Sequence, residues 1–368
     1  MKALLFEGIR QVVCATVPDP SILDAGDVIV RVRAAAVCGS DLHVYRGLET
    51  GLDAGTVMGH ELAGEVVEAG PEVTRFRSGD LVVSPFTTSC GGCFYCRLGL
   101  TARCVRGQLF GWVQEGRGLH GVQAEYVRVP LADSTLVAVP KGTPPEEALF
   151  AGDILATGWF GAESAGAAPG KTVAIVGCGP VGLMAVIAAR ELGAERVFAI
   201  DSLPDRLALA GRWGAEPVDF RKDDPLERIR EATEGRGADA VVEAVGTPQA
   251  SRLAFDLVRP GGTIAAVGVH VEDHLAFAPG EVYDKNLTYR AGRCPARAYM
   301  DRLLPLIQSR KYDLGTLISH RLSLAEGPLG YDLFDRRVEG CTKVVLTPDP
   351  AAQASGAPAN GFSSALSP

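Results

Sequence analysis

Cysteine and long apolar runs are both scarce in this sequence. Only 9 of the 368 residues are cysteine, too few for a disulfide scaffold of this size. The longest apolar stretch, residues 173–189, is interrupted by glycine and proline, which indicates a strand, a tight loop and a helix rather than a membrane span. The N-terminus carries a four-residue apolar run, far shorter than a secretory signal needs. We therefore expect a cytoplasmic protein without a membrane partner.

An excess of positive charge is also absent. The formal net charge is −8 at pH 7 and the isoelectric point is near 5.4. Neither nucleic acid nor an anionic membrane would be attracted to such a surface, so a small-molecule partner is expected. Hydrophobic residues make up 47% and charged residues 22% of the chain, as in ordinary globular proteins. The length predicts two domains.

Two patterns of secondary structure divide the chain. Residues 1–153 hold short runs rich in valine and isoleucine separated by glycine and proline, which predicts a β-rich domain with long loops. Over residues 154–292, buried strands alternate with amphipathic helices, which predicts a doubly wound parallel α/β sheet. Residues 293–347 contain one helix-like segment and a β-like end and are expected to return to the first domain. Residues 349–368 are small, polar and proline-rich and are expected to be disordered.

A dinucleotide site is predicted within the α/β region. The segment GCGPVG (177–182) fits the pattern G-x-G-x-x-G, follows a strand and opens a helix. Gly177 would make the turn, Gly179 would let the backbone approach a pyrophosphate, and Gly182 would let the helix pack closely on the sheet. The helix N-terminus would then face the phosphates.

Asp201 ends the next strand, 24 positions after Gly177. Its carboxylate would accept hydrogen bonds from the adenosine ribose and repel a 2′-phosphate, which favours NAD over NADP. Arg206 lies nearby and keeps NADP open as the alternative. A solvated carboxylate at a strand end is the simpler interpretation of Asp201.

Four of the nine cysteines lie in one short stretch, residues 89–105, with the spacing C-x2-C-x2-C-x7-C. Cys90, Cys93, Cys96 and Cys104 offer four soft thiolates, which is typical of a closed, tetrahedral structural zinc site. An iron–sulfur cluster is the alternative. Either occupant would brace the loop without taking part in catalysis.

A second set of metal ligands is suggested by VCGSDLH (37–43) and GHE (59–61). Cys38 and His60 would form a mixed zinc site if a third ligand joined them. In isolation, a buried cysteine and a structural histidine are the plainer interpretation.

Taken together, CGSDLH, GHE, the four-cysteine stretch, AGDILATG (151–158) and GCGPVG make the chain resemble the zinc-dependent medium-chain alcohol dehydrogenases. The resemblance covers residues 1–347 and is nearest to bacterial NAD-dependent tetrameric members. It implies a GroES-like catalytic domain beside a Rossmann domain, NAD, two zinc ions per chain, and a homotetramer with a dimer as the alternative.

Residue by residue, the resemblance implies a catalytic zinc held by Cys38, His60 and Asp153, with Glu61 close to the metal. An N-cap of the following helix is the competing role for Asp153. Ser40 and His43 match the residues that form a proton relay in this family, although His43 could instead be a loop histidine whose hydrogen bonds are satisfied locally. Phe86 and Trp112 match the substrate pocket, although Trp112 could serve only packing. The expected cofactor contacts are Gly177, Gly179, Pro180, Val181, Gly182, Asp201, Arg206, Val269 and Lys343, the last beside the pyrophosphate.

These features predict hydride transfer between an alcohol, or an aldehyde or ketone in reverse, and a nicotinamide cofactor. Ser40 would take the alcohol proton and pass it toward solvent through His43. A polyol, amino-alcohol or formaldehyde dehydrogenase on the same scaffold is the alternative activity. A non-catalytic NAD-binding protein is the alternative of a different class.

Overall fold

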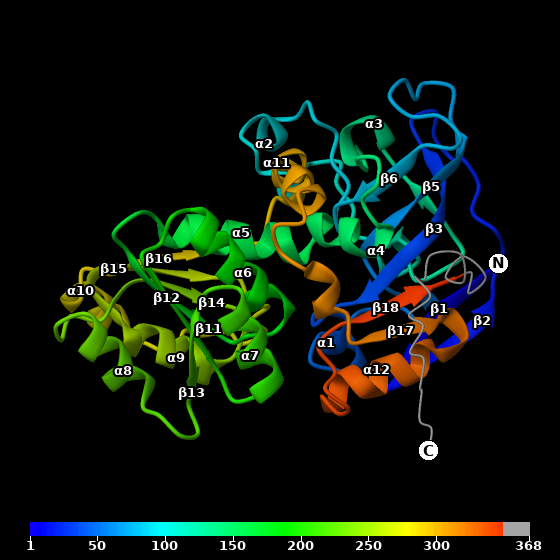
Figure 1. Ribbon diagram of the computed structural model, residues 1–368. Helices are drawn as coiled ribbons and strands as arrows, with labels where there is room; N and C mark the ends of the chain where they lie inside the picture. Colours follow the sequence, from blue (N-terminus) through cyan, green and yellow to red (C-terminus); the bar gives the residue numbers. More distant parts are fainter. Residues whose placement is uncertain (349–368) are drawn as a thin grey trace, which may run out of the picture.

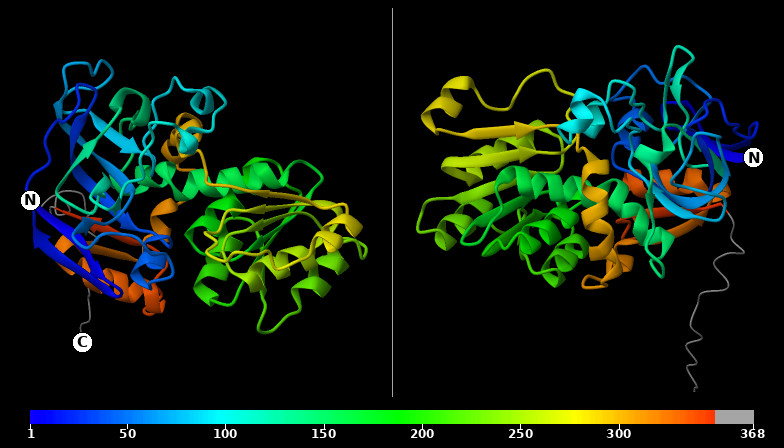
Figure 2. Two further views of the ribbon diagram at one scale, coloured as in Figure 1. Left: turned by 180° about the vertical axis from the view of Figure 1, so that it is seen from behind. Right: turned by 90° about the horizontal axis from the view of Figure 1, so that it is seen from above.

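The computed structural model describes residues 1–348 and places them in two domains side by side (Figures 1 and 2). The predicted disordered tail, residues 349–368, lies outside the described residues. The helix α5 (Ile154–Ala165) runs from one domain into the other (Figure 1).

The α/β domain is built on a six-stranded parallel sheet in the order β13-β12-β11-β14-β15-β16. Its strands are β11 (Thr172–Val176), β12 (Arg196–Asp201), β13 (Glu216–Asp219), β14 (Ala238–Glu243), β15 (Val258–Ala266) and β16 (Thr288–Ala291). The helices between and beside them are α6 (Pro180–Glu191), α7 (Pro204–Arg212), α8 (Pro225–Ala232), α9 (Pro248–Leu257) and α10 (Pro279–Asp284).

Alternation along β11 explains why both faces of this sheet are covered. Val173 and Ile175 pack in the core that includes α5 and α6, whereas Ala174 and Val176 pack in the core that includes α8 and α9. All four are buried, as expected when helices lie on both faces of a parallel sheet. The predicted doubly wound sheet is thus confirmed.

The other domain is built on sheets in which every strand pair is antiparallel except β17 with β18. A seven-stranded sheet contains β10 (Val137–Ala138), β6 (Leu81–Ser84), β5 (Glu61–Ala69), β3 (Val28–Val37), β18 (Val344–Thr347), β17 (His320–Ser323) and β9 (Tyr126–Val129). Smaller sheets contain β2 (Gln11–Thr16), β1 (Lys2–Gly8) and β4 (Thr56–Val57), and β7 (Trp112–Gln114) with β8 (Arg117–Leu119). Because β17 and β18 come from the C-terminal part, the chain returns to its first domain.

Short helices close the antiparallel domain and its junction with the α/β domain. They are α1 (Asp41–Tyr45), α2 (Phe94–Arg97), α3 (Ala132–Thr135), α4 (Pro145–Ala148), α11 (Ala296–Gln308) and α12 (Gly327–Arg336), with 3-10 turns η1 (Thr101–Arg103), η2 (Leu149–Gly152), η3 (Leu314–Leu317) and η4 (Leu324–Glu326). The helix α11 packs against η1, η2 and α5, so the chain leaving the α/β domain crosses directly over the junction.

Candidate active site

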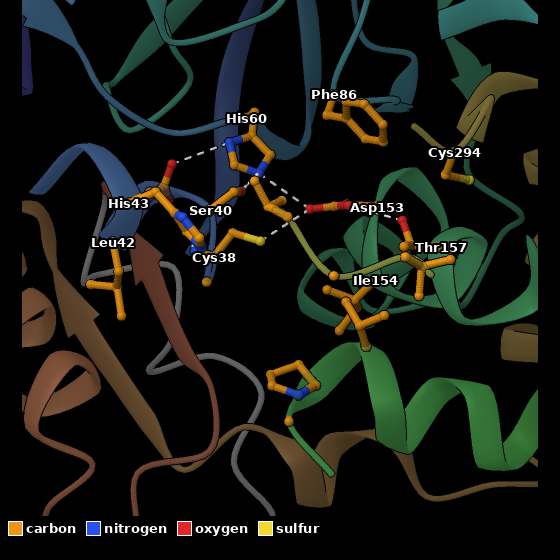
Figure 3. A pocket seen from close by; sticks show the side chains of 18 of the residues that line it. Cys38, Ser40, Leu42, His43, His60, Phe86, Asp153, Ile154, Thr157 and Cys294 are labelled. Carbon is orange, nitrogen blue, oxygen red and sulfur yellow. Dashed lines mark hydrogen bonds and ion pairs between the residues drawn. The ribbon is translucent and has the colours of Figure 1, made fainter. Parts of the chain in front are cut away.

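Four potential metal ligands converge where the strands of the antiparallel domain meet α5. Cys38 follows β3, His60 and Glu61 lie at the start of β5, and Asp153 immediately precedes α5. The register pairs Ala36 with Glu61, which brings the end of one strand to the beginning of the other. One ligand atom from each of the four residues lies within 4.8 Å of the others, and Figure 3 shows Cys38, His60 and Asp153 facing one another.

The contacts within this cluster are short. The Asp153 Oδ2 atom lies 3.4 Å from Cys38 Sγ and 3.2 Å from His60 Nε2. Although Asp153 occupies the N-cap position of α5, its side chain makes no capping hydrogen bond. The carboxylate is thus directed at the cysteine and the histidine.

Asp41 fixes the orientation of the His60 ring. The Asp41 Oδ1 atom lies 3.2 Å from His60 Nδ1, and the other carboxylate oxygen accepts a hydrogen bond from the Cys38 amide at 3.0 Å. Because Nδ1 faces Asp41, Nε2 is left toward the cluster, which is the usual support of a metal-binding histidine. Sequence reasoning missed Asp41, and its position three residues after Cys38 is the signal that was available.

The charges of these groups are mutually dependent. Burial raises the pKa of the Cys38 thiol, and the Asp153 carboxylate raises it further. Burial also acts to raise the pKa of Asp153, but the hydrogen bond and charge of His60 outweigh it, and the pKa is lowered. Glu61 Oε2 is buried without a hydrogen-bond partner among the described residues. One thiolate, one imidazole and one carboxylate, with an unsatisfied oxygen beside them, fit the donor chemistry of zinc.

Lys343 lines the cleft and also forms a buried ion pair. Its ammonium group forms an ion pair with Glu61 and donates to the carbonyl of Val37 at 3.1 Å. The Lys343 and Glu61 side chains are both 0% exposed. A buried carboxylate and a carbonyl thus already engage this ammonium, and the expected pyrophosphate contact stays a prediction.

The expected relay and pocket residues lie around the same cluster. Ser40 Oγ is 3.3 Å from His60 Nε2, and the ring of Phe86 meets that of His60 edge-on at a centroid distance of 6.3 Å. His43 is half-buried, its Nδ1 has no hydrogen-bond partner among residues 1–348, and burial lowers its pKa. Trp112, at the start of β7, lines the same cleft as the other three.

One cleft of about 510 Å³ joins this cluster to the glycine loop of the α/β domain. The predicted cofactor residues that line it are Gly177, Gly179, Pro180, Val181, Val269 and Lys343. Gly177 has φ +89°, and a Cβ atom on Gly182 would lie 1.8 Å from the Gly177 carbonyl oxygen. Both positions therefore require glycine.

Asp201 and Arg206 lie outside the lining of the cleft. The Asp201 carboxylate accepts hydrogen bonds from the amides of Cys178, Ser202 and Leu203 at 2.8, 2.6 and 3.0 Å. Arg206 Nη1 is 3.9 Å from the same carboxylate. Asp201 thus fixes the glycine loop at the end of β12, a role that sequence reasoning did not assign.

The four-cysteine stretch forms a separate cluster. One sulfur from each of Cys90, Cys93, Cys96 and Cys104 lies within 4.8 Å of the others, and none of these residues lines the cleft. Amides donate to the sulfurs, including Cys90 N to Cys104 Sγ at 3.2 Å. Backbone hydrogen bonds at Cys96 and Val105 lower the pKa of Cys93 to about 6. Burial and the side chains of Cys93 and Cys104 raise the pKa of Cys96 to about 12, so the fit to a four-coordinate metal rests on the proximity of the four sulfurs.

Comparisons with known proteins agree with this geometry. Residues 24–141 match the alcohol dehydrogenase GroES-like domain, and residues 180–309 match the zinc-binding dehydrogenase family. A zinc-type alcohol dehydrogenase B from Aspergillus flavus is 45% identical over 343 residues, covering 91% of this chain and 79% of that protein. The chain belongs to the zinc-dependent medium-chain alcohol dehydrogenase family.

Two further relatives of this chain are also alcohol dehydrogenases. The structure of alcohol dehydrogenase TADH from Thermus sp. ATN1 superposes with a TM-score of 0.88 at 40% identity, covering 94% of this chain and 99% of that one. An NADP-dependent isopropanol dehydrogenase from Thermoanaerobacter brockii is 38% identical over 299 residues, covering 80% of this chain and 84% of that protein. Zinc-dependent oxidoreduction of alcohols follows from family membership, whereas relatives differ in their nicotinamide cofactor.

Within residues 1–348, no helix has the length and apolar character needed to cross a membrane.

His270, to which sequence reasoning gave no role, lines the cleft, and its Nε2 lies 2.9 Å from Glu243 Oε2. Glu243 also accepts hydrogen bonds from the amides of Val245 and Gly246. This pair therefore links the loops after β14 and β15 beside the cofactor cleft.

Proposed function

We propose that this alcohol dehydrogenase prefers NAD and uses one catalytic and one structural zinc per chain. The observation that carries the proposal is the convergence of Cys38, His60 and Asp153 on the wall of the cleft that also holds the glycine loop. Substrate in this cleft would lie between the metal ligands of one domain and the cofactor loop of the other.

Cys38, His60 and Asp153 would hold the catalytic zinc, and Cys90, Cys93, Cys96 and Cys104 would hold the structural zinc. When bound, zinc supplies Lewis-acid chemistry at the substrate oxygen, and the nicotinamide supplies hydride acceptance. Phe86 and Trp112 would exclude water from the substrate, since both present aromatic surface to the cleft.

Ser40 would accept the alcohol proton at Oγ and pass it toward His43. Both residues line the cleft, and α1 carries them on one short segment after Cys38. The lowered pKa of His43 keeps its imidazole neutral near pH 7 and able to accept a proton. Glu61, held by Lys343, would stay beside the metal ligands as a nearby anion.

The preference for NAD rests on Asp201. Its carboxylate ends β12 beside the glycine loop, and its negative charge would disfavour a 2′-phosphate. Three amide donors leave part of its acceptor capacity for the ribose hydroxyls. Arg206 is held at Asp201, which partly offsets its attraction for a phosphate.

We also propose a cytoplasmic homotetramer, with a dimer as the alternative assembly. Self-association is favoured by apolar side chains exposed on the four-cysteine stretch, where Phe94, Leu98 and Val105 are 62%, 60% and 70% exposed. Light scattering on the purified protein measures the assembly directly.

The activity is tested by adding a simple alcohol and NAD to zinc-loaded protein and following NADH absorbance. The account expects turnover that is lost on chelation, restored by zinc, and slower with NADP. No NADH formation from any primary or secondary alcohol, with two zinc ions per chain present, would refute it.

A further inference from the structure

Arg293 is a cation in the cleft that the reaction described above does not use. It follows β16, two residues after Ala291, at the point where the chain leaves the α/β domain. Its side chain lines the same cleft as Cys38, His60 and Asp153. Among residues 1–348, it makes no hydrogen bond or ion pair.

The neighbouring Cys294 fixes this segment next to the proposed catalytic centre. Cys294 is 2% exposed, and its thiol interacts with the hydroxyl of Thr157 and the charge of Asp153. Figure 3 shows Cys294 on the Thr157 side of Asp153. Because Cys294 is buried and contacts Thr157 of α5, the backbone of Arg293 has a defined position at the cleft.

The charges around Arg293 leave an excess of one positive charge. Burial lowers the pKa of its guanidinium, with Arg103 of η1 acting in the same direction and Glu49, which follows α1, opposing it. Glu49 and Arg293 line the cleft from different elements, and Arg103 acts on Arg293 from outside the cleft lining. Glu49 forms no ion pair within 4.0 Å with Arg293 or any other residue of the described part.

Apolar side chains also line this cleft, among them Phe86, Leu109, Phe110 and Trp112. A cleft that combines apolar walls, a polar cluster and an unpaired guanidinium is complementary to a molecule with an apolar part and two polar groups. An arginine fork matches carboxylate or phosphate oxygens better than any other anion geometry.

We propose that Arg293 binds an anionic group of the substrate, so that the preferred substrates are alcohols, or the corresponding aldehydes, that also carry a carboxylate or phosphate. This inference rests on the proposed function, since the reacting hydroxyl must lie at Cys38, His60 and Asp153. Arg293 acts as a specificity-determining residue and takes no part in hydride or proton transfer.

The test compares ω-hydroxycarboxylates with neutral 1-alkanols of matched chain length, with alcohols ending in a phosphate monoester as a second anionic series. The protein should have a higher kcat/KM for an anionic substrate of one favoured length than for its neutral partner. A charged hydrogen bond of this kind corresponds to about 10- to 100-fold. Arg293→Leu should remove that ratio, whereas Arg290→Leu, an exposed arginine of β16 outside the cleft lining, should leave it intact.

Glu49→Gln separates anion binding from a simple contact between the domains. If Arg293 binds an anionic substrate, removing the Glu49 carboxylate, which would repel that substrate, should raise kcat/KM for the anionic series. If Glu49 and Arg293 instead hold the domains together, Glu49→Gln should lower turnover of both series, and the proposal is overturned. It is also overturned if Arg293→Leu weakens NADH binding while leaving the anionic-to-neutral ratio unchanged. Turnover of neutral alcohols without any anionic preference would refute this proposal alone, whereas no turnover of either series would refute the proposed function.

Discussion

The ammonium of Lys343 and the carboxylate of Glu61 form an ion pair buried directly beside the Cys38, His60 and Asp153 cluster. β18 begins immediately after Lys343, and Glu61 begins β5. The pair thus joins the returning C-terminal strand to the strand that carries His60. Burial raises the pKa of Glu61 to about 7 despite the opposing effect of Lys343, so the carboxylate depends on that ammonium for its charge.

Lys343→Met should therefore destabilise the protein strongly. Removing one partner of a buried pair leaves an uncompensated charge, which costs about 3–5 kcal/mol. Denaturant unfolding of the variant and the parent protein measures the difference. The double variant Glu61→Gln with Lys343→Met removes both charges and should lose clearly less stability than the single variant. Equal losses in the two variants would show that the pairing contributes nothing.

Cys96→Ser should release the structural zinc and lower thermal stability while leaving the chemistry intact. The four sulfurs are close enough to share one metal, and none lines the cleft. Loss of a structural zinc removes folding free energy, so the midpoint of thermal unfolding should fall on the order of 5 °C or more. Cys14→Ser, in β2 away from both clusters, is the control. Loss of turnover in a fully folded, normally assembled variant would contradict this division of roles.

Asp201→Gly should relax the cofactor preference. Losing charged hydrogen bonds to the ribose should lower kcat/KM for NAD about 10- to 100-fold, while NADP should improve because the repulsion of its 2′-phosphate is gone. Because Asp201 also holds three amides, some loss of stability should accompany the change. Asp205→Asn, in the first turn of α7, is a control for charge alone. An unchanged NAD-to-NADP ratio in the Asp201 variant would exclude the ribose role.

The contribution of His270 should depend on pH. The hydrogen bond and charge of Glu243 raise the pKa of His270, against the effect of burial. A raised pKa in the folded state means that the stabilisation is fully present below the unfolded value of about 6.5 and is lost as pH rises through the folded value. His270→Gln should cost about 1 kcal/mol at acidic pH and little at alkaline pH. A cost that is the same at both pH values would indicate packing alone.

Most of the fold follows from patterns of neighbouring residues. The glycine loop follows β11 and opens α6, and Asp201 ends β12, as the sequence predicted. The first strands, β1 and β2, were not predicted, because their hairpin packs on α12 and on other distant segments that no local pattern reveals. β18, at Val344–Thr347, is the β-like end that was expected of residues 293–347.

The site was predictable only where a motif fixes the chemistry. The four cysteines could be named from their spacing, and Cys38, His60 and Asp153 from the family resemblance. The structure brings the members of each set together. Asp41 and Glu243 could not be found this way, because their roles come from contacts to His60 and His270 made in the folded chain. The ion pair of Lys343 could not be found for the same reason, since its partner Glu61 is 282 positions away.

The central claim, a catalytic zinc held by Cys38, His60 and Asp153, is tested most directly by Asp153→Asn. Asparagine keeps the size and the capping ability of aspartate but removes the anion. Because the Asp153 side chain makes no capping hydrogen bond, the change should affect the fold little, and Asp301→Asn on the exposed side of α11 is a matched control. Turnover should fall at least about 100-fold, beyond the usual cost of losing an outer partner of a metal ligand.

The deciding measurement is the zinc content of the folded Asp153→Asn protein. The substitution leaves only Cys38 and His60 as ligands of the catalytic zinc, so this zinc should be lost. About one zinc per chain should remain, the one in the four-cysteine site. Two zinc ions per chain with near-normal turnover would contradict the account and return Asp153 to a purely structural role.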